Sequence, residues 1–176
     1  MKRRPTVRFI PELNMQKVVA AIRKPTVGLY SEDGINLVTN THVILVLTDE
    51  DLWHVQTSLR LREVGMMYQT GSTVPYRPFP EQARKLIAEA INAKNIPIEV
   101  TGLSDRNNNA YLARDGGFII IQKAYLDVFN VIKTVEQAAD NPNSVVLVNG
   151  KHLICPVRGT VSKYLALPQR ARLEAV

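Results

Sequence analysis

The chain has 176 residues, of which 45% are hydrophobic and 22% are charged, and this favours a globular protein of one domain or two small, closely packed halves. No apolar run approaches the roughly 20 residues of a membrane span, and one cysteine, Cys155, excludes an intramolecular disulfide, so we expect a cytoplasmic protein with no membrane partner. The net charge of +6 points to polyanionic partners.

The first forty residues predict a strand, a helix and a hairpin. Arg8–Leu13 can form a short edge strand, although Pro11 limits it. Asn14 is well placed to cap a helix over residues 15–24, whose apolar side chains recur with helical spacing. Asp33-Gly34 then stands between two alternating stretches and suits the two-residue turn of a hairpin.

Residues 41–69 predict a buried strand that leads into a helix. The run THVILVLT is apolar enough to be buried on both faces of a sheet. Thr48 can cap the helix that follows, and Asp49, Glu50 and Asp51 suit the positive end of its dipole. Helix capping therefore explains this acidic cluster without a metal ion. Residues 64–69 predict a further strand.

The second half of the sequence predicts elements of the same kinds. Residues 71–80 contain three prolines and read as a connector, and Pro80 opens a helix over residues 81–94. A strand is expected at 96–103, and two hairpins are expected around Asp115-Gly116 and Asn149-Gly150. Residues 123–139 show apolar side chains at three- and four-residue spacing, which predicts a helix.

The order helix, three strands, helix, strand therefore occurs twice. THVILVLTDEDLWHVQTSL at 41–59 resembles GGFIIIQKAYLDVFNVIKTV at 116–135, and KVVAAI at 17–22 resembles KLIAEA at 85–90. We expect an α+β fold, with one or two mainly antiparallel sheets and helices packed on one face. Residues 1–158 would form one compact domain of two related halves, about 9–70 and 80–158, followed by a basic tail at 159–176.

The sequence contains no pattern typical of a catalytic or metal-binding protein. His42, His54 and His152 form no pair at metal-ligand spacing, and no cysteine cluster accompanies them. No glycine-rich phosphate loop and no nucleophile elbow are present. We therefore expect a non-enzymatic protein with no metal and no small-molecule cofactor.

Basic residues are concentrated at the two ends of the sequence. Residues 1–24 carry a net charge of +6, residues 158–176 carry +3, and the stretch between them sums to −3. Basic ends on a compact body are typical of arms that bind a polyanion, although charged termini can also serve solubility alone. Arg60 and Arg62 lie at the end of the predicted helix after Thr48, and other basic residues lie in or beside predicted loops and hairpin ends, near tyrosines that could stack on bases. Tyr111 could instead pack inside its strand, and Arg60 and Arg62 could only complement the end of their helix. The predicted nucleic-acid-binding residues are Lys2, Arg3, Arg4, Arg8, Arg60, Arg62, Arg77, Arg106, Arg114, Lys151, Arg158, Tyr76, Tyr111 and Tyr164.

Two functions fit these patterns. The first is a mostly sequence-nonspecific nucleic-acid-binding protein, which favours RNA or single-stranded DNA because no recognition helix is apparent. The second is a structural protein, such as a shell component, scaffold or adaptor. It would form a homo-oligomer through sheet edges and through the apolar side chains of its C-terminal tail.

Overall fold

The computed structural model describes residues 10–115 and 117–157, and in this part of the chain it contains four helices and two antiparallel sheets. The elements, in chain order, are α1 (Met15–Ile22), β1 (Thr26–Glu32), β2 (Ile35–Thr39), β3 (Val43–Leu47), α2 (Asp49–Leu59), β4 (Met66–Gln69), β5 (Pro75–Pro78), α3 (Glu81–Asn92), β6 (Asn95–Pro97), β7 (Glu99–Ser104), β8 (Asn109–Arg114), β9 (Gly117–Gln122), α4 (Lys123–Leu126), β10 (Val135–Ala138), β11 (Val146–Val148) and β12 (His152–Ile154). The predicted α+β class with antiparallel sheets is confirmed.

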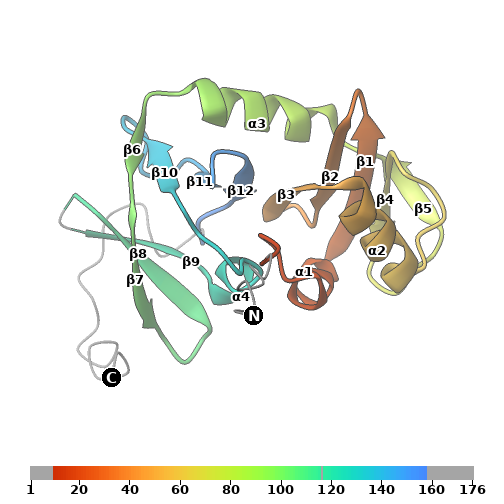
Figure 1. Ribbon diagram of the computed structural model, residues 1–176, viewed down its shortest axis with the longest axis horizontal. Coiled ribbons are helices and arrows are strands. Elements are labelled where there is room, and N and C mark those ends of the chain that lie inside the picture. Colours follow the sequence, from red (N-terminus) through yellow and green to blue (C-terminus); the bar gives the residue numbers. More distant parts are fainter. Residues whose placement is uncertain (1–9, 116, 158–176) are drawn as a thin grey trace, which may run out of the picture.

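The larger sheet joins strands from both halves of the chain. Its order is β5-β4-β1-β2-β3-β12-β11-β10-β6, so five N-terminal strands lie on one side and four C-terminal strands on the other. The two groups meet where β3 pairs with β12, through Ile44 opposite Leu153 and Val43 opposite Ile154 (Figure 1). A smaller sheet has the order β7-β8-β9 and lies beside the C-terminal group.

The turn and cap signals lie where the sequence predicts them. Asp33-Gly34 and Asn149-Gly150 both have positive φ angles, of 54° and 76° and of 52° and 69°, as a two-residue hairpin turn requires. The Asn14 side chain accepts a hydrogen bond from the Lys17 amide, and the Thr48 hydroxyl accepts one from the Asp51 amide. The acidic cluster after Thr48 is therefore the first turn of α2.

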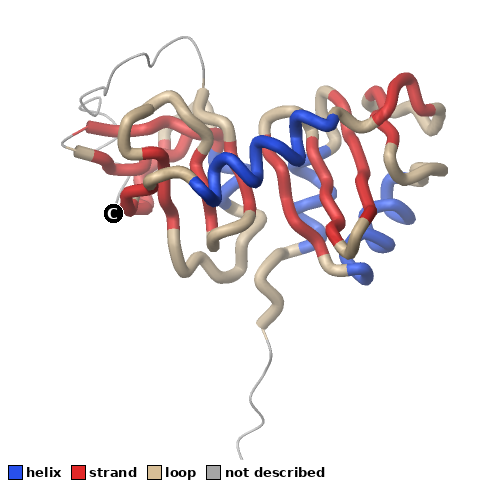
Figure 2. Tube along the Cα trace, turned by 90° about the horizontal axis from the view of Figure 1, so that it is seen from above, coloured by secondary structure: helices blue, strands red, loops and turns tan. Residues whose placement is uncertain are grey.

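Helices cover both faces of the large sheet, so the prediction that they lie on one face is wrong. The first core contains buried residues of α1, α2 and α4 together with Leu29 of β1 and Val38 of β2. The second core contains Ala83 of α3 with Tyr30 of β1 and Leu37 of β2. Figure 2 shows α3 crossing above the strands, with the other helices beneath them. Because β1 and β2 bury side chains on both of their faces, other elements must pack against each face of the sheet.

Residues 123–139 do not form the predicted long helix. Helix α4 ends at Leu126, and the same stretch later contains strand β10. The residues between them pair with the segment before α1: the Asn14 amide donates to the Val128 carbonyl, and the Asn130 amide donates to the Glu12 carbonyl. This long-range pairing overrides a helical pattern that is rich in β-branched residues.

Several other expectations are changed by the pairing of strands. The expected strand at 96–103 is divided between β6 of the large sheet and β7 of the small one. The expected connector at 71–80 contains β5, which pairs with β4. Of the expected strand Arg8–Leu13, the described part contributes one bridge, between Leu13 and Phe129.

The predicted repeat is not seen in the described residues. The strands of the two similar segments, 41–59 and 116–135, lie in different sheets. Strand β3 is central in the large sheet, whereas β9 is an outer strand of the small one. None of the helices in residues 10–115 and 117–157 is long and apolar enough to cross a bilayer.

Candidate nucleic-acid interface

Six of the predicted contact residues lie outside the described part of the chain, and the structure gives no account of them. They are Lys2, Arg3, Arg4, Arg8, Arg158 and Tyr164.

Strand β5 presents an exposed aromatic ring together with a guanidinium group. Tyr76 is 43% exposed, and the Arg77 guanidinium carbon lies 5.3 Å from the centre of its ring. Arg77 is opposite Met67 of β4, and β5 is the outermost strand of the large sheet. The pairing of β5 with β4 shifts register at Tyr76, because Pro75 lies opposite Tyr68 and Arg77 lies opposite Met67. The pair is therefore held at a bulge in the outermost strand, where a ligand can approach it.

Arg60 and Arg62 are exposed on the loop that leads from α2 to β4. Arg60 ends α2 with a φ of 55°, and its amide donates to the carbonyls of Gln56 and Thr57. The Phe79 amide donates to the Gly65 carbonyl at 2.8 Å, which ties this loop to the chain leaving β5. Arg60 and Arg62 therefore lie at the same end of the molecule as Arg77.

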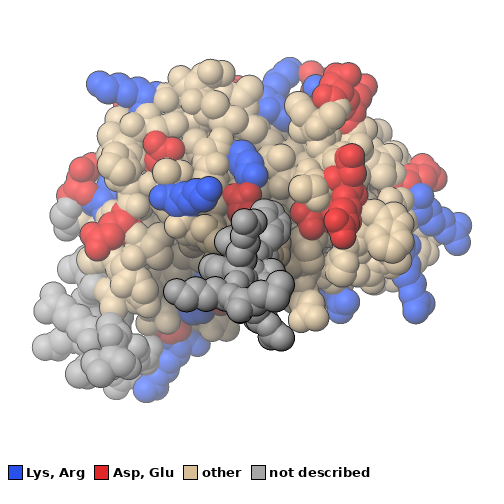
Figure 3. All heavy atoms as spheres, in the orientation of Figure 1, with Lys and Arg blue, Asp and Glu red and all other residues tan. Residues whose placement is uncertain are grey.

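Two more basic residues reach this end from α1. Arg23 and Lys24 are exposed after α1, and the Thr70 hydroxyl, in the turn after β4, donates to the Arg23 carbonyl at 2.8 Å. Sequence reasoning counted both in the basic N-terminal stretch but did not select them, because their position beside β4 depends on the fold. We call Arg23, Lys24, Arg60, Arg62, Arg77 and Tyr76 the basic end. Figure 3 shows Lys and Arg side chains projecting at this right-hand edge.

Acidic side chains limit how far the basic end extends. Glu63 is exposed in the same loop and offsets one of the five positive charges. Trp53 of α2 is 66% exposed, but Asp49 and Glu50 lie one turn earlier on the same face of the helix. Those carboxylates would repel phosphates, so we exclude Trp53 from the interface.

Arg114 and Tyr111 are buried, which corrects their predicted exposure. Arg114 is 4% exposed, and its guanidinium donates to the Gln137 side chain and to the Ala139 carbonyl. The Tyr111 hydroxyl donates to the Asp105 carboxylate at 3.0 Å, and burial together with this bond raises the pKa of Tyr111. Both residues lie on β8 with their side chains buried, so neither can reach a phosphate or a base.

Lys151 and Arg106 are separate from the basic end. The Lys151 ammonium lies 2.6 Å from a Glu12 carboxylate oxygen, which neutralises its charge. Burial alone would raise the pKa of Glu12, but hydrogen bonds from Lys151 and Asn149 hold it below its usual value. Arg106 is exposed in the turn between β7 and β8, on the small sheet.

His152 belongs to the same cluster as Lys151 and Glu12. Its Nδ1 accepts from the Val46 amide at 3.1 Å, and its Nε2 lies 3.2 Å from the Glu12 carboxylate. Burial lowers the pKa of His152 to about 4, against the opposing effect of Glu12. Both ring nitrogens are occupied within the protein, so this histidine holds the fold together and cannot take a proton from a substrate.

In residues 10–115 and 117–157, no three His, Cys, Asp or Glu side chains converge in a way that could hold a metal ion. Comparison with protein-family models, with curated proteins and with solved structures gives no match for this chain.

Proposed function

We propose that the protein binds single-stranded nucleic acid, either RNA or DNA, through the basic end and with little sequence preference. The observation that carries the proposal is the exposed Tyr76–Arg77 pair on strand β5. Single-stranded sites combine an aromatic face for a base with positive charges that follow the backbone. A cytoplasmic location is part of the same proposal, because the single cysteine fits a reducing compartment.

The basic end supplies both kinds of contact from different elements. Arg60, Arg62 and Arg77 are exposed and can neutralise phosphates, while the Tyr76 ring offers a stacking surface for one base. Stacking of one base on an aromatic ring contributes about 1–3 kcal/mol and tolerates any base. These contacts are made to phosphates and to the flat face of a base, and none is a hydrogen bond to the edge of a base. We therefore expect weak sequence preference.

Self-association through the outer strands of the large sheet is less well supported. Strand β5 contains Pro75 and Pro78, and strand β6 at the opposite edge contains Pro97. Proline has no amide hydrogen to donate to a neighbouring strand and is a common protection of sheet edges. We therefore place the assembly function second.

The proposal predicts a specific loss of binding when the basic end is neutralised. A chain with Arg60→Ser, Arg62→Ser and Arg77→Ser should bind a labelled single-stranded oligonucleotide more weakly than the wild type. Three lost phosphate contacts should lower the slope of log affinity against log salt by about 2, because each contact contributes about 0.7. Fluorescence anisotropy over a salt series measures both quantities.

A matched control removes three positive charges elsewhere. Lys85, Lys94 and Lys133 are exposed and lie outside the basic end, so Lys85→Ser, Lys94→Ser and Lys133→Ser give the same change in net charge. This control should keep most of the wild-type affinity. Equal losses in the two triple variants would show that net charge alone is responsible, and no binding by the wild type at low salt would end the proposal.

A further inference from the structure

We infer that a pocket between α1, α4 and the small sheet binds a small monocarboxylate with an apolar body. The cavity has a volume of about 340 Å³, which lies within the usual range for ligand sites. It is separate from the basic end, and the inference does not depend on nucleic-acid binding.

The walls of the pocket are mainly apolar. Val100 and Ile132 are 39% and 36% exposed, although both are apolar, while Leu126 and Phe129 are buried. The pocket exists because α4 ends at Leu126, which lets the loop carrying Phe129 and Ile132 turn away from the helix axis. A ligand with an apolar body would cover the exposed side chains and gain the free energy of their burial.

An irregularity in β7 shapes one wall. Val100 is opposite Leu112 and Ser104 is opposite Ala110, so four steps along β7 match two steps along β8. Gly102, inside this bulge, has a φ of 75°, which glycine adopts without strain. The bulge places Gly102 and Leu103 on the pocket wall, where a regular strand would have continued its pairing with β8.

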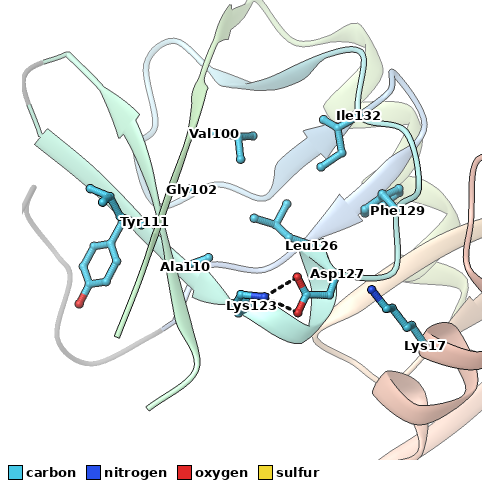
Figure 4. A pocket seen from close by; sticks show the side chains of 11 residues that line it. Lys17, Val100, Gly102, Ala110, Tyr111, Lys123, Leu126, Asp127, Phe129 and Ile132 are labelled. Atoms are coloured by element: carbon cyan, nitrogen blue, oxygen red, sulfur yellow. Dashed lines mark hydrogen bonds and ion pairs between the residues drawn. The ribbon is translucent and has the colours of Figure 1, made fainter. Parts of the chain in front are cut away.

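Three charged side chains lie at one side of the pocket. The Lys123 ammonium contacts both carboxylate oxygens of Asp127, at 2.7 and 2.6 Å. Figure 4 shows Lys17 extending from α1 toward this pair. Two ammonium groups and one carboxylate give an excess of one positive charge among the residues that line the cavity.

This arrangement selects the charge and the orientation of the ligand. Two donors of Lys123 are used by Asp127, and the third remains for a ligand, as do the donors of Lys17. A single carboxylate would satisfy the excess positive charge, whereas a dianion would exceed it and a cation would be repelled by the two lysines. The carboxylate would then face Lys17 and the apolar body would lie against Val100, Leu103 and Ile132.

The experiment uses the full chain, with octanoate as the probe and octanamide as its neutral partner of the same shape. Octanoate should shift the NMR amide signals of Val100, Leu103 and Ile132, with a dissociation constant on the order of 0.1–1 mM for a ligand of this size. Octanamide should bind about tenfold more weakly, because it cannot pair with the lysines. Equal binding of the two probes, or shifts centred elsewhere, would overturn the inference.

Two variants test the role assigned to Lys17. Lys17→Met should weaken octanoate binding about tenfold and leave octanamide binding unchanged, because the loss of one ion contact is confined to the charged probe. Lys94→Met, on the exposed segment after α3, makes the same chemical change away from the pocket and should bind octanoate normally. Normal octanoate binding by Lys17→Met would refute the assignment. The Arg60, Arg62 and Arg77 variant should retain octanoate binding, so this inference and the proposed function can fail separately.

Discussion

At the residue scale, His152 makes the stability of the protein depend on pH. Its pKa falls from an ordinary 6.5 to about 4 in the folded protein, so the unfolded chain binds the proton more tightly. The stabilisation from neutral His152 is complete above pH 6.5 and is lost as the pH falls toward 4. The lowered pKa of Glu12 adds to the loss at the acid end of this range, because the unfolded chain also binds that proton more tightly.

We therefore expect the free energy of unfolding to fall by about 3 kcal/mol between pH 7 and pH 4 on account of His152. Urea unfolding at several pH values measures this fall. In His152→Gln the pH dependence between 6.5 and 4 should be much smaller, on a lower overall stability. His54→Gln, at a partly exposed position of α2, is the control and should keep the wild-type profile. A wild-type stability that is constant from pH 7 to 4.5 would contradict this reading.

Gly28 is the second residue on which a specific loss of stability is expected. A Cβ atom at this position would lie 2.1 Å from Met67 Sδ and 3.0 Å from Phe79 Cδ2, and Met67 is fully buried. Gly28→Ala should therefore destabilise the fold by about 1–3 kcal/mol through overpacking. Thermal unfolding checks this, with Ser31→Ala at an exposed position of the same strand as the control. A Gly28→Ala protein as stable as the wild type would show that the Met67 side chain can move aside at no cost.

At the scale of elements, local signals were predictable and long-range ones were not. The caps at Asn14 and Thr48 and the turns at Asp33-Gly34 and Asn149-Gly150 depend on neighbouring residues, and the sequence contains all of the information. The end of α4 and the path of the chain after it depend on residues 128–130 pairing with the segment before α1, more than one hundred residues away, and no local pattern reveals this pairing. Strand β10 in turn depends on its partners β6 and β11.

The residues of the candidate sites also divide into those that local sequence could identify and those that depend on the fold. Residues of the Tyr76–Arg77 pair are polar and close in sequence, so their selection needed no knowledge of the fold. Arg114 was selected for the same reasons, but its partner Gln137 lies in the stretch that was predicted as helix. The monocarboxylate pocket was not foreseen, because it depends on where α4 ends.

At the scale of the whole molecule, one apolar core connects the two sheets. Leu112 and Ile121 of the small sheet belong to the same buried cluster as Val18 of α1 and Val55 of α2. Helix α3 crosses the opposite face of the large sheet (Figure 2). We expect the described part of the chain to unfold in one cooperative transition, because opening either sheet would expose the shared core.

The circular dichroism of the whole protein and the NMR amide signals of β1 and of β9 should therefore give coincident urea-unfolding curves. Separate midpoints for the two strands would show that the small sheet is an independent unit.

The pairing of β3 with β12 also affects how the protein folds during its synthesis. Val43 and Ile44 of β3 pair with Ile154 and Leu153 of β12, which are synthesised about 110 residues later. The sheet formed by the N-terminal strands therefore has an unpaired edge until nearly all of the described chain has left the ribosome. During that interval β12 is absent, so the open edge of the apolar strand β3 can pair with another unfinished chain. A short delay in translation before Val146 would lengthen this interval, and a truncated product ending there would keep the edge of β3 open permanently.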